Sequence, residues 1–170
     1  IPPFADAHNH HIGTGAEELD RKAIRKYIEG GVFYVKIQGN LPITITAKKK
    51  LGMNMPTGID VLFSQGTVTA TGGMPIMIVE KIHPMQGFNK GYSNEQLKDF
   101  RYYTIDNEKE LEEKWPKIIA QNPDFIKTFL WRSGDYEKLK NDTSVFFKGI
   151  DPALVPKIVS KAHAQHLNVS

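Results

Sequence analysis

Two histidines near the amino terminus are the first residues of this 170-residue chain whose types and spacing could do chemistry. They belong to the segment Asp6-Ala7-His8-Asn9-His10. On a β-strand, side chains at positions i and i+2 point to the same face, so the two imidazoles would project side by side. Neutral imidazole is a common ligand of divalent transition metals. The spacing indicates either a pair of metal ligands or, as the alternative, a polar strand end that faces solvent. His11 would point to the opposite face, and we do not expect it to be a ligand.

A lysine inside an apolar segment is the second chemical candidate. Phe125, Lys127 and Phe129 would share one face of a strand at 124–130, which places the ammonium among apolar side chains. Burial favours the neutral amine, which can act as a nucleophile, act as a base, or take up carbon dioxide as a carbamate. A carbamate has the geometry of a carboxylate and can bridge two metal ions. The alternative is a lysine at a strand end whose ammonium reaches water.

Four further residues are candidates for a site or for a structural role. Trp131 and Arg132 directly follow the strand at 124–130, where substrate contacts collect in parallel α/β enzymes, and Arg132 could hold a substrate carboxylate. We expect His83 to be a residue of a surface loop, and contact with the substrate is the alternative. His163 stands at a helix end, where a structural or dipole-compensating role is expected.

The elements that must position these residues alternate between strand and helix. Strands are expected at 4–10, 32–37, 59–63 and 124–130, and helices at 16–29, 41–52, 107–120 and from 151 to about 162. Asp151 is expected to cap the last helix, with Pro152 in its first turn, and the chain then enters a new strand. Pro116 is expected to kink or split its helix. This order predicts a parallel α/β architecture.

Two stretches do not follow the alternation. The Gly-, Thr- and Met-rich stretch 65–92 is typical of a long functional loop, within which 76–82 could pair as a strand. The stretch 131–148 is expected to be a polar excursion from the fold.

Composition excludes several classes of protein. Hydrophobic residues make up 40% and charged residues 24% of the chain, an ordinary globular balance. The 22 Lys and Arg exceed the 19 Asp and Glu by a margin too small and too scattered to indicate nucleic-acid binding. No apolar run reaches the ~18 residues of a membrane span. The absence of cysteine excludes disulfides and thiolate metal sites, and it fits an exported or periplasmic protein better than a cytosolic one.

The two ends of the sequence predict that it is part of a longer protein. The chain begins with Ile1 rather than Met, and it stops at Ser170 just after a new strand begins. We therefore expect residues 1–170 to form a single partial domain.

These features together resemble the amidohydrolase superfamily of metal-dependent hydrolases. The HxH at the end of a first strand is similar to its first metal ligands. Asp124-Phe125-Ile126-Lys127 resembles the fourth-strand lysine of its binuclear, carboxylated-lysine branch, which includes Xaa-Pro dipeptidase-like and imidazolonepropionase-like enzymes. Asp151-Pro152, Ala162-His163 and Leu167-Asn168-Val169 resemble the helix that leads into strand five of that branch. The resemblance spans most of the chain in order, and it is loose over 41–103.

The resemblance implies a TIM-type (β/α)8 barrel, of which this chain would be about the first four β/α units. An open three-layer sheet with a strand-order reversal is the second expectation. His8 and His10 would be ligands of the more buried metal, and carbamylated Lys127 would bridge two ions, for which zinc is expected before manganese, cobalt or iron. The family's other ligands, a His on strand five, a His on strand six and an Asp on strand eight, cannot be placed in this sequence.

The function implied is hydrolysis of an amide or peptide-type C–N bond, with a dipeptide or an acylated amino acid as substrate. Cyclic amides, lactones and phosphoesters remain alternatives, as does a non-catalytic half barrel that serves as a structural or interaction module. We expect the isolated chain to be inactive, to hold metal weakly with Lys127 unmodified, and either to form a homo-oligomer or to expose an apolar seam.

Overall fold

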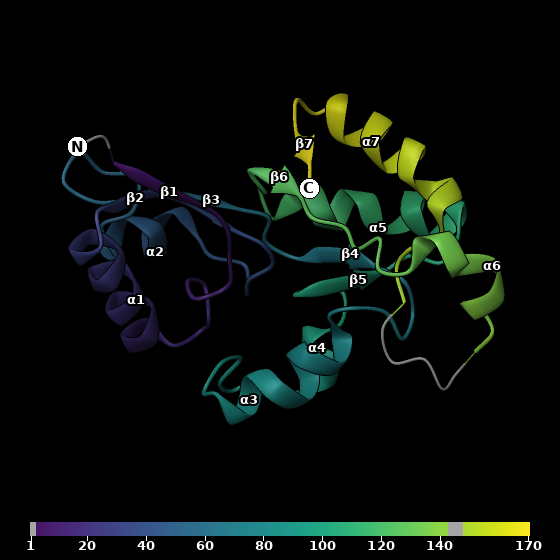
Figure 1. Ribbon diagram of the computed structural model, residues 1–170, viewed down its shortest axis with the longest axis horizontal. Coiled ribbons are helices and arrows are strands. Elements are labelled where there is room, and N and C mark those ends of the chain that lie inside the picture. Colours follow the sequence, from purple (N-terminus) through teal and green to yellow (C-terminus); the bar gives the residue numbers. More distant parts are fainter. Residues whose placement is uncertain (1–2, 143–147) are drawn as a thin grey trace.

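The computed structural model describes residues 3–142 and 148–170, in which the named strands pair in parallel (Figure 1). Strands β1 (Phe4–Asn9), β2 (Val32–Ile37) and β3 (Asp60–Phe63) form one sheet in that order. Strand β4 (Thr67–Thr69) pairs with β5 (Tyr102–Thr104), and β6 (Phe125–Ile126) pairs with β7 (Asn168–Val169). The described strands therefore form three short sheets.

Helices connect and cover these sheets. The longer ones are α1 (Glu17–Glu29), α5 (Glu108–Ala120) and α7 (Val155–His163). The shorter ones are α2 (Ile45–Lys50), the π-helix η1 (Ile78–Ile82), α3 (His83–Met85), α4 (Asn94–Leu97), η2 (Ser133–Asp135), α6 (Tyr136–Leu139) and η3 (Pro152–Leu154). No helix among the described residues is long and apolar enough to cross a membrane.

The predicted alternation of strand and helix is confirmed at most positions. Helix α5 begins after Asn107, whose side chain accepts a hydrogen bond from the Glu110 amide, and the split expected at Pro116 is wrong, since the helix continues through that residue. Asp151 accepts a hydrogen bond from the Ala153 amide at the start of η3, as its capping role predicts. The chain then passes through α7 into β7.

The expectation of the first four units of a TIM-type barrel is wrong for the described residues. One continuous ladder of strands would be required, and the structure has separate sheets of three, two and two strands with no closed barrel among them. The ladder ends at β3, since β4 pairs with β5 and not with β3, and Gln65, between β3 and β4, has a left-handed conformation with φ of 58°. Isolated contacts replace the ladder, such as the parallel bridge between Val68 and Thr128.

Several local expectations also need correction. The segment expected to pair as a strand at 76–82 contains η1, and the stretch expected to be a loop contains the buried strand β4. The strand expected at 124–130 is limited to β6, because its next residues divide their hydrogen bonds between partners: Lys127 O accepts from Val68, and Thr128 N donates to Ser170. The expected polar excursion contains η2 and α6, and its residues 143–147 lie outside the described part.

Three apolar clusters stabilise the fold. One packs α1 against the β1–β2–β3 sheet, and includes Ile24, Val35, Ile37, Val61 and Phe63. The next packs α5 and α7 against β4, β5 and β6, and includes Val68, Leu111, Trp115, Ile126 and Ile158. A smaller one lies around η1 and α4 and includes Leu41, Val79, Leu97 and Tyr102.

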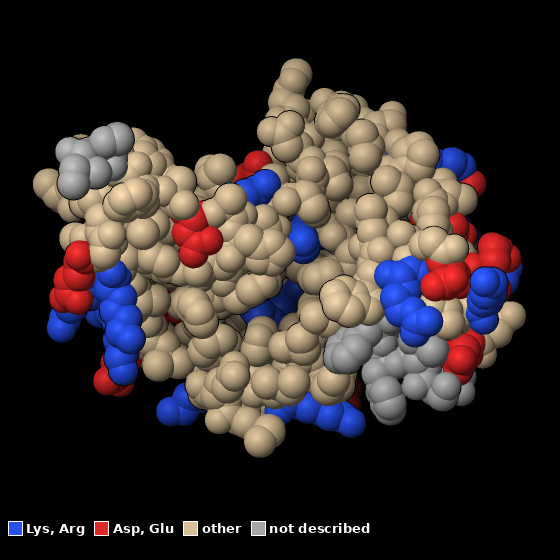
Figure 2. Space-filling model, in the orientation of Figure 1, with Lys and Arg blue, Asp and Glu red and all other residues tan. Residues whose placement is uncertain are grey.

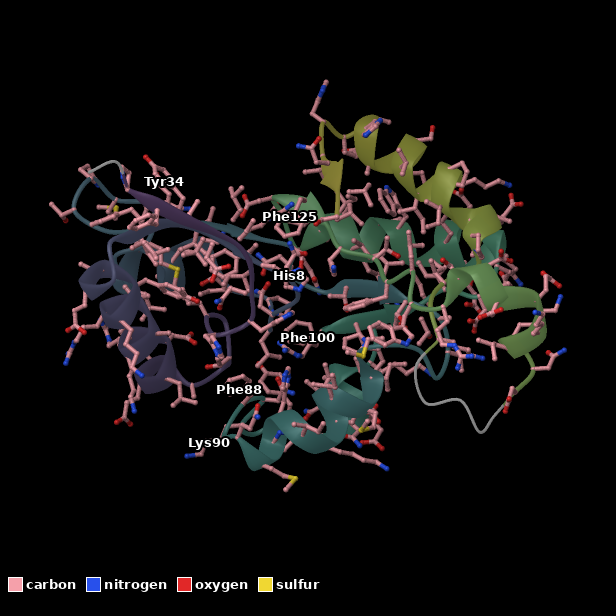
Figure 3. The ribbon with its side chains drawn as sticks, in the orientation of Figure 1. His8, Tyr34, Phe88, Lys90, Phe100 and Phe125 are labelled. Atoms are coloured by element: carbon pink, nitrogen blue, oxygen red, sulfur yellow. The ribbon has the colours of Figure 1, made fainter. Side chains whose placement is uncertain are left out.

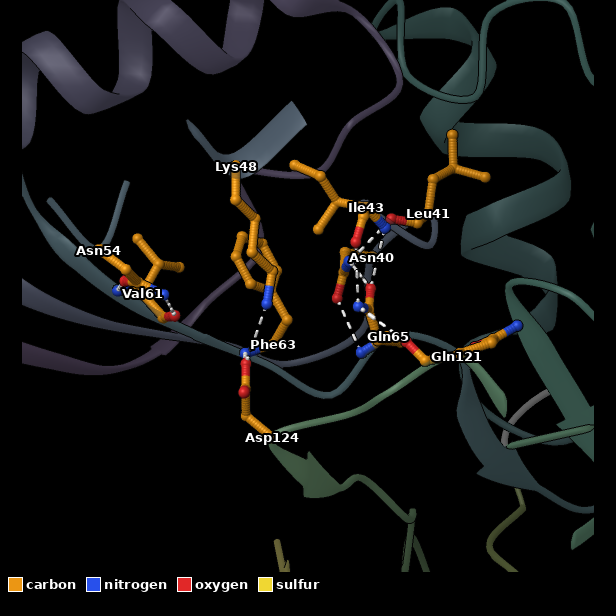
Figure 4. A network of polar contacts seen from close by, with 10 residues as sticks. All are labelled: Asn40, Leu41, Ile43, Lys48, Asn54, Val61, Phe63, Gln65, Gln121 and Asp124. Carbon is orange, nitrogen blue, oxygen red and sulfur yellow. Dashed lines mark hydrogen bonds and ion pairs between the residues drawn. The ribbon is translucent and has the colours of Figure 1, made fainter. Parts of the chain in front are cut away.

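A buried polar junction joins the first sheet to the rest of the molecule (Figure 4). The backbone N–H of Gln65 donates to Asn40 Oδ1 at 3.0 Å, and Asn40 Nδ2 donates to the side-chain oxygen Oε1 of Gln65 at 2.9 Å. The side chain of Gln65 also accepts from the Ile43 amide and donates to the carbonyl of Gln121 at the end of α5. We call Asn40, Gln65 and their partners the amide junction.

We expect Asn40→Ala to lower the free energy of unfolding by about 2–3 kcal/mol. The substitution leaves the buried Gln65 N–H and one side-chain oxygen of Gln65 short of partners, and each such group costs about 1–3 kcal/mol. Urea unfolding measures the effect, and Asn168→Ala, at an exposed position of β7, is the control. Equal stabilities of the two variants would contradict a stabilising role of the amide junction.

Candidate functional site

A cavity of about 430 Å³ opens near the centre of the molecule, between the first sheet, β4, β6 and the segment that carries η1 and α3. Figure 2 shows Lys and Arg atoms inside the central hollow of this face. The titratable residues that line the cavity are His8, His10, His11, His83, Arg101 and Lys127, and none of the described lining residues is Asp or Glu. Cationic and neutral groups therefore meet here without a carboxylate in the described lining.

The predicted histidine pair lies at the edge of this cavity. His8 is on β1 and His10 directly follows it, and their ring centroids are 5.3 Å apart in an edge-to-face arrangement. Asp6 shapes the strand end, because its carboxylate accepts hydrogen bonds from the His8 amide at 3.0 Å and from Asn9 Nδ2 at 2.7 Å. In Figure 3, His8 lies near the middle of the molecule, between β1 and the strands of the other two sheets.

The surroundings of this pair favour neutral imidazoles. Burial, reinforced by the positive charges of neighbouring side chains, lowers the pKa of His10 to about 4. The partial loss of solvent around the His8 ring and the charge of Lys127 also lower the pKa of His8, although the residue as a whole is exposed. At neutral pH both rings therefore have a free lone pair, the state that binds a metal.

Lys127 enters the same cavity from the chain that follows β6. Its carbonyl accepts a hydrogen bond of 2.8 Å from the Val68 amide, which fixes this segment against β4. The side chain does not reach open solvent, since the residue is only 9% exposed, and its ammonium lies 4.9 Å from the centre of the Phe129 ring. Burial and the nearby charge of Lys36 lower the pKa of Lys127, which increases the fraction of reactive neutral amine.

His83 and Arg101 form a second pair that the sequence did not indicate as a site. The expectation that His83 is a surface loop residue is wrong: it is buried in α3 and lines the cavity. An Arg101 Nη2 atom lies 3.1 Å from His83 Nδ1, and because a guanidinium can only donate, Nδ1 is the acceptor. Burial and the charge of Arg101 lower the pKa of His83 to about 4. No motif could have revealed Arg101, which precedes a strand of three residues.

The structure places some of the remaining sequence-predicted residues at the cavity and others away from it. Trp131 lines the cavity and is 54% exposed. Arg132 is exposed and is not among the lining residues. His11, which was expected to point away, does line the cavity. His163 is exposed at the end of α7.

His8, His10 and Lys127 fit part of a metal site. They bring two neutral imidazoles and a buried amine into one cavity, and no carboxylate in its described lining pairs with the amine. Among residues 3–142 and 148–170, no group of three or more His, Asp or Glu side chains is placed to hold a metal ion. The described residues thus offer an incomplete set of ligands.

Comparison with known proteins bears on the fold. No family model matches this chain, and no curated protein matches it. The solved structure of A. niger ochratoxinase has a TM-score of 0.65 and 14% identity, over 99% of this chain and 42% of that one. A solved structure of an uncharacterized protein has a TM-score of 0.61 and 13% identity, over 99% of this chain and 42% of its own.

These likenesses show that the chain shares its fold with part of both solved structures, and at such identities they concern the fold alone. They assign the chain to no family. The chain spans less than half the length of the solved structures that it matches.

We expect the stability of the protein to fall as the pH is lowered from 6.5 toward 4, in part because of His83. Its pKa is about 4 in the folded state and about 6.5 when unfolded, so in this window the unfolded chain binds a proton that the folded one does not. The contribution is about 1.4 kcal/mol per pH unit. His83→Gln should flatten the curve by this amount in urea unfolding, with the exposed His163→Gln as control. If the stability of the wild type and of His83→Gln depended on pH in the same way, the conclusion that buried His83 is neutral in the folded protein would be contradicted.

Proposed function

We propose that this chain supplies part of the metal site of a metal-dependent hydrolase that cleaves an amide bond. One observation carries the proposal: His8 and His10, at the end of β1, and Lys127, just after β6, line the same cavity. Their environments favour the neutral forms that metal binding and carbamate formation require. A structural role alone does not explain why three such groups meet in a cavity whose described lining includes no carboxylate.

The fold supports the same class of protein. One solved structure of similar fold is, by its name, the enzyme ochratoxinase, a hydrolase. What that enzyme acts on is a property of that protein, and it does not set the substrate of this chain. The substrate that we propose here is a small amide, either a dipeptide or an acylated amino acid.

His8 and His10 would hold a divalent metal, for which zinc suits the imidazole ligands, and carbamylated Lys127 would connect it to a second ion in the complete protein. A divalent metal supplies such sites with an activated water, whose pKa falls toward ~7, and with polarisation of the scissile carbonyl. The remaining ligands and the proton acceptor would come from the rest of the complete protein.

The chain's own polar atoms can orient the substrate. Gln38 Oε1 and the hydroxyls of Thr67 and Thr128 are buried without hydrogen-bond partners among the described residues, and all three residues line the cavity. Buried polar atoms of this kind are normally satisfied, so they are available to the N–H and C=O groups of a bound amide. Side chains of Met74, Ile78 and other apolar residues form the wall and exclude water.

Zinc titration of the 170-residue chain should shift the ring signals of His8 and His10 in NMR spectra before those of the exposed His163. His8→Ala should raise the zinc concentration required at His10 by more than about tenfold, because a direct ligand matters more than an outer-shell partner. His163→Ala is the matched control. An equal effect of both variants, or a folded complete protein that contains no divalent metal, would refute the metal site.

Lys127→Ala in the complete protein should remove the bridge, most of the activity and part of the bound metal. Added short carboxylic acids should partly restore activity, because a carboxylate has the shape of the lost carbamate. NMR spectra of the zinc-loaded protein in ¹³C-bicarbonate should show a carbamate carbon in the wild type and in Lys90→Ala, a control variant at an exposed position. The signal should be absent from Lys127→Ala. A carbamate signal that survives Lys127→Ala would assign the modification to another residue.

A further inference from the structure

Arg101 is a buried cation without a counter-ion among the described residues. The residue is 3% exposed, and its Nε and Nη1 atoms have no hydrogen-bond partner in the described part of the chain. The neighbour that its Nη2 contacts, His83, is neutral and does not balance the charge. A buried and unpaired charge destabilises a fold, which indicates that a ligand supplies the missing partner.

The free edge of this guanidinium matches a carboxylate. Nη2 carries two hydrogens and His83 Nδ1 can accept one of them, so one edge of the group still presents two parallel N–H donors. This fork fits the two oxygens of a carboxylate, and such charge-assisted pairs are strong. The cavity that Arg101 lines is large enough for a small molecule, and none of its described lining residues carries a carboxylate that would compete.

We propose that Arg101, positioned by His83, binds the carboxylate group of the substrate. The inference rests on the proposed hydrolase function, and it names the residue that would hold the free carboxylate of a dipeptide or an acylated amino acid. Val79, Phe88 and other apolar residues line the same cavity, so the carboxylate would be flanked by an apolar group. Inorganic phosphate shares the negative charge but would leave these apolar walls without a partner.

Two other cations are less suited to this role. Lys127 would lose its positive charge on carbamylation, and it is assigned to the metal. Arg132, the arginine that the sequence indicated for a carboxylate, is exposed and does not line the cavity. The structure therefore favours Arg101 as the carboxylate-binding residue, because it is buried and because it lines the cavity.

Binding of three probes to the metal-free 170-residue chain tests the proposal: N-acetyl-L-leucine, its neutral amide N-acetyl-L-leucinamide, and inorganic phosphate. NMR titration should show the carboxylate binding at least about tenfold more tightly than the amide, and more tightly than phosphate. The Arg101 Nε–H signal should shift with the carboxylate. Arg101→Met should abolish the preference, whereas the exposed control Arg25→Met should retain it.

Thermal unfolding separates a binding role from a structural one. Arg101→Met should leave the midpoint of the free protein unchanged or higher, because it removes a buried charge that lacks a counter-ion in the described residues. It should also lose the rise that N-acetyl-L-leucine causes in the wild type. If Arg101→Met does not fold, the wild-type protein alone tests the proposal, through its relative affinity for the carboxylate and the amide and through the shift of its Arg101 Nε–H signal.

Equal affinity for carboxylate and amide, tighter binding of phosphate, or loss of the preference in Arg132→Met instead of Arg101→Met would overturn the assignment. Because no metal is added, the result does not depend on metal binding by His8 or on carbamylation of Lys127. If the 170-residue chain prefers the carboxylate probe but the complete protein holds no metal, the carboxylate site stands and the proposed hydrolase function fails. If the complete protein holds metal but the 170-residue chain shows no preference, the hydrolase function stands and the carboxylate site fails.

Discussion

The amide junction of Asn40 and Gln65 is the interaction on which the arrangement of this molecule depends. The strand ladder ends at β3, so continuous sheet hydrogen bonding does not fix the first sheet against β4 and β6. Separate hydrogen bonds fix it instead: Asn40 and Gln65 exchange hydrogen bonds with each other, the Asp124 carboxylate accepts from the Phe63 amide at 2.8 Å, and the Asp124 amide donates to the Phe63 carbonyl at 2.8 Å. Because buried polar groups are costly without partners, this arrangement has few alternatives. It places the ends of β1 and β6 around one cavity, which brings His8 and Lys127 together.

Charge balance links the two ends of that cavity. As an ammonium, Lys127 adds to the positive charge of Arg101, and both would repel a divalent metal from the His8 and His10 rings. Carbamylation replaces a positive charge with a negative one, which turns the metal end from repulsive to attractive. A substrate carboxylate on Arg101 would neutralise the other end. The absence of Asp and Glu from the described lining residues is consistent with a site whose negative charges arrive with its ligands.

The sequence predicted the parts of this protein whose signals are periodic or local. The apolar stripes of α1 and α5, the Asp151 cap and the same-face geometry of His8 and His10 follow from spacing alone. Strands β4 and β5 have three residues each, too few to show a period, and therefore the burial of Arg101 could not be predicted. The barrel was expected from resemblance and is wrong for the described residues, because the pairing of strands far apart in the sequence is not encoded in any local pattern.

Burial gives the cavity a direction that constrains how a substrate would lie in it. Arg101 is 3% exposed and His83 is also buried, whereas His8 is exposed and Trp131 is 54% exposed. A carboxylate held by Arg101 would therefore lie deep, with the rest of the molecule extending toward the rim. In a dipeptide or an acylated amino acid, the amide bond is separated from the carboxylate by one carbon atom, so it would follow directly after the buried end. The amino acid that leaves would then occupy the inner part beside Val79 and Phe88, and the acyl group would extend past the His8–His10 pair toward Trp131. On this view the interior selects the amino acid, and the more open rim tolerates variation in the acyl group.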